Sequence, residues 1–167
     1  HTSQTRAGYE AERDHSTPTS LGTLTAPIVS DVKSDGDYAL RLLSQTVRTQ
    51  YGYDIVHGPS VISDAFTGEQ GQTMQFDWKA ASGGDAYDIY GYLLNTEDGS
   101  ATEILNSTGT YGIGSNDTDW ATADVTIPSD GTYNFVFVSG TYDYTGGKYA
   151  GASLYIDNLQ VYNAVTD

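Results

Sequence analysis

The chain has 167 residues, enough for one domain with a hydrophobic core. It carries 22 acidic and seven basic residues, and five of the basic ones precede residue 51, so no basic stripe is present for nucleic acid or anionic lipid. The absence of cysteine excludes disulfides and zinc–thiolate sites, and no apolar run approaches membrane-spanning length.

Residues 1–22 are polar and lack periodicity, and we interpret them as a flexible lead-in or linker to a single domain over residues 23–167. The 19 glycines, 14 tyrosines and scarce helix-forming runs favour an all-β domain with many turns. No signal peptide is visible, as we expect for a piece excised from a larger protein.

The sequence pattern identifies some of the first elements after this lead-in more clearly than others. Residues 38–50 fit either a strand or one face of a helix, because Leu40, Leu43 and Val47 are also helically spaced. Residues 61–66 predict a strand. The clearest strand is 73–80, where apolar and polar side chains alternate strictly.

The second half of the chain predicts a series of antiparallel strands. Residues 87–95 and 101–106 form a hairpin around Asp98-Gly99, and strands follow at 120–127, 132–139 and 152–162. Eight or nine strands without helix–strand alternation predict a two-sheet antiparallel β-sandwich of jelly-roll type.

The last strand contains a change of parity at Asp157-Asn158. Leu154 and Ile156 share one face, whereas Leu159 and Val161 take the opposite parity, which predicts a β-bulge between them. A bulge turns a carboxylate and an amide oxygen away from the pleat. Two interpretations stay open for Asp157: a hydrogen bond to a turn amide, or a ligand to a metal ion.

Further carboxylates lie at predicted strand ends beside glycines. Asp85 and Asp88 bracket the entry to one strand, and Asp143 follows another. Calcium takes six to eight oxygens from carboxylates, backbone carbonyls and water, and a turn through Gly84 can expose such carbonyls. We therefore predict Ca2+ as cofactor, with Asp85, Asp88, Asp143, Asp157 and Asn158 as candidate ligands.

Tyrosines gather near these acids, and some of them must belong to the core. Tyr87 shares a face with Ile89 and Leu93 and is assigned to the core, whereas Tyr90 shares the face of Asp88 and is a candidate ligand contact. Tyr142 and Tyr144 could wall a pocket. Lys148 could pair with an acid or receive a ligand carboxylate.

Catalytic chemistry has little support in the sequence. His57 is the one histidine outside the lead-in, and no Gly-x-Ser-x-Gly motif is present. The pair Asp85 and Asp88 could in principle hydrolyse a glycoside, but nothing in the sequence raises the pKa of either carboxyl. We expect a binding module and not an enzyme.

Several motifs, taken in order, resemble a module of bacterial repeat-in-toxin adhesins, over roughly residues 30–163. They comprise Gly58–Val61, Asp64–Thr67, Phe76–Ala80, Gly83–Asp88, Gly91–Leu93, Phe135–Asp143 and Gly151–Asn158. The resemblance implies a calcium-dependent peptide-binding β-sandwich that holds the C-terminal carboxylate of a short peptide. It also implies that Asp85, Asp88, Asp143, Asp157 and Asn158 are the site residues.

The resemblance therefore implies an extracellular module of a cell-surface adhesin, acting in cell adhesion or biofilm formation. The expected partner is a peptide or protein C-terminus on a host or microbial surface, held by Ca2+ because an acidic protein otherwise repels an anionic terminus. The first alternative is a carbohydrate-binding jelly roll in which tyrosines stack on sugars. A second is a structural spacer that Ca2+ stiffens.

Overall fold

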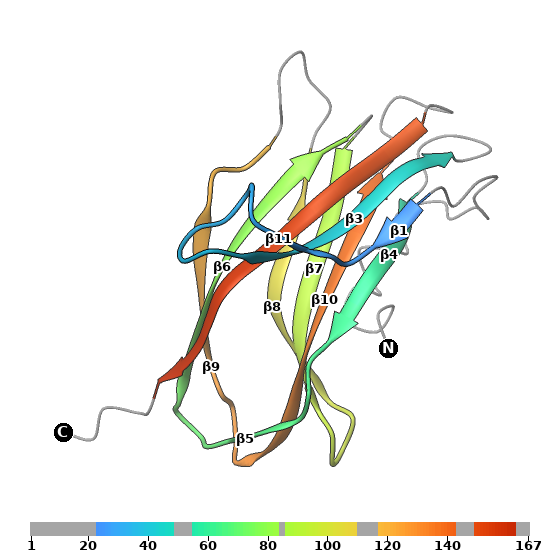
Figure 1. Ribbon diagram of the computed structural model, residues 1–167. Coiled ribbons are helices and arrows are strands. Elements are labelled where there is room, and N and C mark those ends of the chain that lie inside the picture. The colour runs from blue at the N-terminus through green and yellow to red at the C-terminus, as the bar shows by residue number, and fades with distance from the viewer. Residues whose placement is uncertain (1–22, 49–54, 84–85, 110–116, 143–148, 163–167) are drawn as a thin grey trace.

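A computed structural model describes residues 23–48, 55–83, 86–109, 117–142 and 149–162, which form eleven strands in two stacked sheets (Figure 1). Every strand pair is antiparallel, so the predicted two-sheet β-sandwich is confirmed. Among these residues there is no helix with the length and apolar character needed to cross a bilayer.

Sheet A has six strands, in the order β1-β3-β11-β6-β9 with β2 paired to β3. Their bounds are β1 Thr23–Thr25, β2 Ile28–Val29, β3 Ala39–Arg48, β6 Thr73–Ser82, β9 Ala121–Thr126 and β11 Tyr149–Tyr162. Sheet B has five strands, in the order β4-β10-β7-β8 with β5 paired to β10. Their bounds are β4 Ile55–Ile62, β5 Phe66–Gly68, β7 Ala86–Asn95, β8 Ala101–Thr108 and β10 Gly131–Tyr142.

The main core lies between the two sheets and follows from alternation along the strands. On β6, Met74, Phe76 and Ala80 are buried and Trp78 packs against them, as the sequence predicts. Tyr87 joins the same cluster from β7, which confirms its assignment to the core. The face opposite this core is called the outer face of each sheet below.

Two segments clarify or correct the sequence-based expectations. The ambiguous stretch 38–50 is a strand where it is described, because β3 pairs with β11 and contributes Leu42 to the core. The prediction of a single strand over residues 61–66 is wrong. The chain leaves β4 after Ile62 and starts β5 at Phe66, and Ser63 between them bonds the backbone of Phe135 instead of continuing the ladder.

The β-bulge predicted in β11 is present. The register of β11 against β6 shifts between Asp157 and Gln160, and Asn158 has a positive φ of 50°. Before the bulge Ile156 pairs with Trp78, and after it Val161 pairs with Met74, so the inward-facing side chains change parity. The bulge turns Leu159 toward the gap between the sheets.

Strand β7 is buried on both faces. Ile89 and Leu93 point into the main core, while Tyr90 and Tyr92 on the outer face form a second cluster with Val136 and Val138 of β10. Gly91 sits between the two tyrosines, and a Cβ at this position would lie 2.8 Å from the ring of Phe137. Glycine therefore allows the Phe137 ring to pack directly on the β7 backbone.

Candidate functional site

The outer face of sheet B carries a pair of parallel tyrosine rings. Tyr90 and Tyr92 have ring centroids 6.4 Å apart and an interplanar angle of 12°. Both residues are only 1% exposed, so neither ring offers a free face to solvent in this structure. Burial raises the pKa of the Tyr92 phenol, because the phenolate would lose solvation.

The carboxylate of Asp88 lies on the same outer face, two residues before Tyr90. Asp88 is completely buried, and its Oδ1 accepts a hydrogen bond of 2.7 Å from the hydroxyl of Thr108 on β8. The pairing of β7 with β8 sets Asp88 opposite Thr108 and thereby fixes this contact. A buried carboxylate on the same face as two tyrosines combines a polar anchor with a flat apolar surface.

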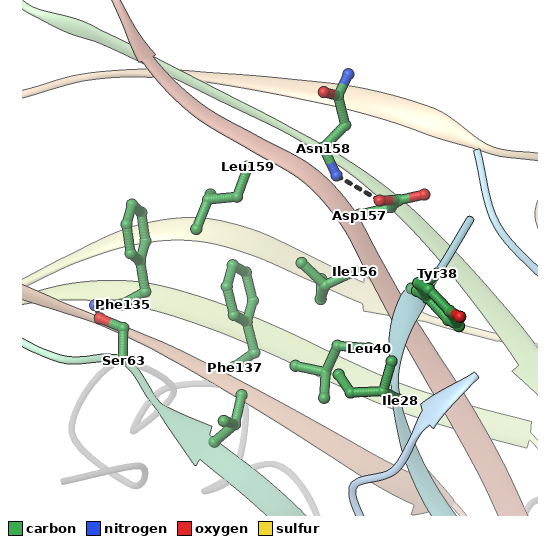
Figure 2. A pocket seen from close by; sticks show the side chains of 12 residues that line it. Ile28, Tyr38, Leu40, Ser63, Phe135, Phe137, Ile156, Asp157, Asn158 and Leu159 are labelled. Atoms are coloured by element: carbon green, nitrogen blue, oxygen red, sulfur yellow. Dashed lines mark hydrogen bonds between the residues drawn. The ribbon is translucent and has the colours of Figure 1, made fainter. Parts of the chain in front are cut away.

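A second carboxylate group lies on the outer face of sheet A. The connection between β2 and β3 passes over this sheet (Figure 1), and its Ser34 and Asp35 donate backbone N–H bonds of 2.8 and 3.2 Å to Oδ2 of Asp157. The backbone N–H of Asn158 donates to Oδ1 at 2.7 Å, as the dashed line in Figure 2 shows. Asp157 thus bonds turn amides, which was one of the two interpretations left open by the sequence.

Asp77 of β6 is paired directly with Asp157 of β11, and Ser34 joins the two carboxylates. The Ser34 hydroxyl donates to Oδ2 of Asp77 at 2.7 Å and lies 3.2 Å from Oδ2 of Asp157. Thr122 donates to the other oxygen of Asp77, also at 2.7 Å. The β-bulge and the β2–β3 connection therefore build a clamp of hydrogen bonds around two carboxylates.

Both carboxylates of this clamp have lowered pKa values. Burial raises the pKa of Asp157, but N–H donors from Ser34, Asp35 and Asn158 outweigh it. Burial also raises the pKa of Asp77, and hydrogen bonds from Thr122, Ser34 and Asn158 again outweigh that effect and the nearby charge of Asp157. The clamp therefore holds both side chains as carboxylates.

The predicted metal ligands do not all share one location. Asp88 lies on the outer face of sheet B and Asp157 on the outer face of sheet A, with the core between them, so these two cannot hold one ion. Within the described ranges, no three His, Cys, Asp or Glu side chains gather as a metal site. The oxygens of Asp157 already accept bonds from N–H groups, so fewer of their lone pairs remain for a cation.

Several predicted site residues lie outside the described residues: Gly84, Asp85, Asp143, Tyr144 and Lys148. Of Tyr142 only the backbone is described, where it pairs with Ala86 and Ile55 at the end of β10. Neither Ser34 nor Asp77 is among the site residues predicted from the sequence. For Asp77 the one available signal is the alternation on β6. This alternation places Asp77 on the outer face but cannot show which segment crosses that face.

No protein-family model matches the sequence, and neither does any curated protein. Among solved structures, the chain is similar to a carbohydrate-binding module of the β-sandwich superfamily with promiscuous specificity. That similarity has a TM-score of 0.51 and 16% identity over 88% of this chain. The chain spans 56% of that protein's length. At this identity, the match supports the sandwich fold alone.

Two further structures are more distant. One is the CBM22-1 xylan-binding domain of Xyn10C from Paenibacillus barcinonensis, with a TM-score of 0.45 and 11% identity over 93% of this chain and 92% of that one. The other is an endo-β-1,4-glucuronan lyase from Trichoderma reesei, with a TM-score of 0.44 and 11% identity over 90% and 93%. At these scores neither carries an argument about function.

Proposed function

We propose that the domain is a non-catalytic carbohydrate-binding module. The observation that carries this proposal is the parallel pair Tyr90 and Tyr92 on the outer face of sheet B, in a sandwich similar to a carbohydrate-binding module. Flat aromatic rings bury the apolar C–H face of a sugar at a low cost in conformational entropy. Two neighbouring rings along one strand suit two successive sugar units.

Polar side chains complete the face on either side of the rings. Asp88 with Thr108 lies toward one end of β7, and Asn106 pairs with Tyr90 across the β7–β8 ladder. Carboxylate and amide groups hydrogen-bond sugar hydroxyls, and such groups set orientation in an otherwise apolar site. The net charge of −15 disfavours polysaccharides rich in uronic acids and favours neutral glycans.

Access to the rings is part of the proposal. Because Tyr90 and Tyr92 are each 1% exposed, a sugar can stack on them only after their outer faces are uncovered. The binding step therefore includes an opening of this face, and we expect the association rate to be slower than that of a preformed open site.

Affinity electrophoresis against soluble neutral and acidic polysaccharides tests the proposal. We expect retardation by a neutral glycan, its loss in Tyr92→Ala, and its partial retention in Tyr92→Phe, which keeps the ring. Tyr162→Ala is the matched control, because Tyr162 is an exposed tyrosine at the far end of β11 and should not affect binding. Retardation that is equal in wild type and in a folded Tyr92→Ala variant would reject this surface.

The Ca2+-dependent peptide-binding function implied by the adhesin resemblance is the second candidate. One observation favours it: the pairing of β7 with β10 ends at Ala86 and Tyr142, and Asp85 and Asp143 adjoin these two residues in the sequence. Asp88 lies two residues after Ala86 within β7, so three acids are close in sequence to this end of the β7–β10 pairing. We propose these three as the ligands of Ca2+, which would supply positive charge for a peptide carboxylate.

Calorimetry separates the two candidates. Peptide binding requires Ca2+, discriminates a free C-terminus from its amide, and fails after chelation. If the domain instead binds glycans through Tyr90 and Tyr92, no ligand carboxylate takes part, and the free-acid peptide and its amide should give the same result. For either candidate we place the domain outside the cell, within a larger protein.

A further inference from the structure

An apolar cavity of about 310 Å³ opens between the two sheets, on the side away from Tyr90 and Tyr92. Its floor is formed by Phe135 and Phe137 of β10, which project toward Ile156 and Leu159 of β11 (Figure 2). Leu40 of β3 and Val61 of β4 close its sides. The cavity is separate from Asp88 and the tyrosine face, and Asp157 and Asn158 of the clamp border it.

Three large side chains stand exposed around the mouth of this cavity. Ile28 is 66%, Tyr38 64% and Leu159 41% exposed, and all three line the opening. Scattered exposed hydrophobic residues are ordinary in soluble proteins, whereas a group around one opening is typical of a binding site. The β-bulge contributes to the group, because it turns Leu159 toward this gap.

The dimensions and the lining indicate what the cavity can hold. An apolar cavity of about 150 Å³ is large enough to bind benzene, and ligand pockets begin at about 300 Å³. The rings of Phe135 and Phe137 lie nearly parallel, with an interplanar angle of 8° and centroids 6.2 Å apart. Aromatic floors favour aromatic guests, which gain offset or edge-on ring contacts in addition to apolar burial.

Charge narrows the choice of guest further. Asp157 borders the cavity, and the connection between β2 and β3, which includes Tyr38, carries Asp31, Asp35 and Asp37 against one cation, Lys33. These acids repel an anionic headgroup at the mouth. We propose that this cavity is a binding site for a small uncharged aromatic molecule.

Two fluorescent probes that differ by one sulfonate test the proposal. N-phenyl-1-naphthylamine is uncharged, and 1-anilinonaphthalene-8-sulfonate is the same ring system with a negative charge. We expect enhanced emission from the uncharged probe, with a Kd at least about tenfold lower than that of the sulfonate in low salt. The difference should narrow as salt screens the acidic rim.

Neighbouring residues of β4 supply a variant and a matched control. Val61 pairs with Phe137 and faces the cavity, while Ile62 pairs with Val136 and is exposed on the opposite face. Val61→Trp fills the cavity and should abolish binding of the uncharged probe, whereas Ile62→Trp should leave its Kd unchanged. If circular dichroism shows that Val61→Trp is unfolded, Ala39→Leu narrows the cavity from sheet A instead.

Three outcomes would overturn the assignment. Equal probe binding by wild type and folded Val61→Trp would place the probe elsewhere. Binding that appears only after residues 1–22 are removed would show that the chain's own lead-in occupies the cavity. A dimer that Val61→Trp dissociates, with no probe binding by the wild type, would show that a second copy occupies it.

Discussion

Asp88 and Asp157 were predicted as members of one set of metal ligands, yet they occupy opposite outer faces of the sandwich. Asp88 is completely buried and receives a hydroxyl from Thr108 on the neighbouring strand. Asp157 is only partly buried and receives backbone N–H groups from the β2–β3 connection. One carboxylate is held within its own sheet, whereas the other fastens a distant segment to the sheet surface.

The comparison shows that the same residue type at a strand can serve different purposes. A carboxylate with backbone N–H donors satisfies those donors and organises a loop, and it has few lone pairs left for a ligand. A fully buried carboxylate such as Asp88 is costly to desolvate, and roles that offset this cost are ligand binding or the fixing of one packing arrangement.

Removing the buried carboxylate should have the largest effect. Asp88→Ala removes the buried acceptor of the Thr108 hydroxyl and the packing of a fully buried side chain, and we expect the free energy of unfolding to fall by about 2–3 kcal/mol. Asp124→Ala is the matched control, since Asp124 also accepts a side-chain hydrogen bond, from Gln75, but is exposed on β9. It should cost under about 0.5 kcal/mol. Urea denaturation measures both, and equal losses would remove the distinction by burial.

A smaller loss is expected from Asp157→Asn, at about 1–2 kcal/mol near neutral pH. The single carbonyl oxygen of asparagine can accept from only some of the N–H groups of Ser34, Asp35 and Asn158. The variant should also change how stability depends on pH, because it removes one of the two carboxyls with a lowered pKa.

The sign of that pH dependence follows from the direction of the shifts. The folded state holds the pKa of Asp157 below its ordinary 3.8, so its stabilisation is present above that pH and is lost as the pH falls through the lower folded value. Denaturation curves between pH 6 and 2 should therefore be less acid-sensitive for Asp157→Asn than for wild type. The control is Asp64→Asn, an exposed aspartate between β4 and β5. If Asp157→Asn leaves the pH dependence of the free energy of unfolding unchanged, the proposed stabilisation by the Asp157 carboxylate is contradicted.

The fold was predictable from local patterns, and the site was predictable only in part. Alternation on β6 and the Asp98-Gly99 hairpin depend on neighbours in sequence, so both appear as expected. The parity change at Asp157 likewise identified the bulge without any knowledge of partners. These features are set by the period of the strand and the geometry of turns.

Contacts made across the fold could not be read in the same way. Ser34 is 123 residues from Asp157 in sequence, and nothing in its polar neighbourhood distinguishes it from other loop serines. The burial of Tyr90 and Tyr92 on an outer face is also invisible to alternation, which marks a face but not its cover. The break between β4 and β5 depends on Ser63 bonding Phe135, another contact between distant residues.

The smallest effect is expected at Ser34, whose hydroxyl joins the two carboxylates of the clamp. Ser34→Ala removes the donor to Asp77 but keeps the backbone N–H that bonds Asp157, so we expect a loss of about 0.5–1 kcal/mol. Ser34→Thr keeps a hydroxyl and serves as the control. Loss of the Ser34 hydroxyl removes one of the three donors that lower the pKa of Asp77, so this pKa should rise toward its ordinary value. The rise should be partial, because Thr122 and Asn158 still donate while burial and the charge of Asp157 oppose them.

A double-mutant cycle with Asp77→Asn determines whether this effect passes through the carboxylate. If the hydroxyl acts on Asp77, Ser34→Ala should cost less in the Asp77→Asn background than in wild type, because the charged acceptor is already gone. Equal costs in both backgrounds would mean that Ser34 stabilises the fold only by its bond to Asp157. The β2–β3 connection would then be fastened to the sheet through Asp157 alone, and Asp77 would be stabilised by its bonds from Thr122 and Asn158.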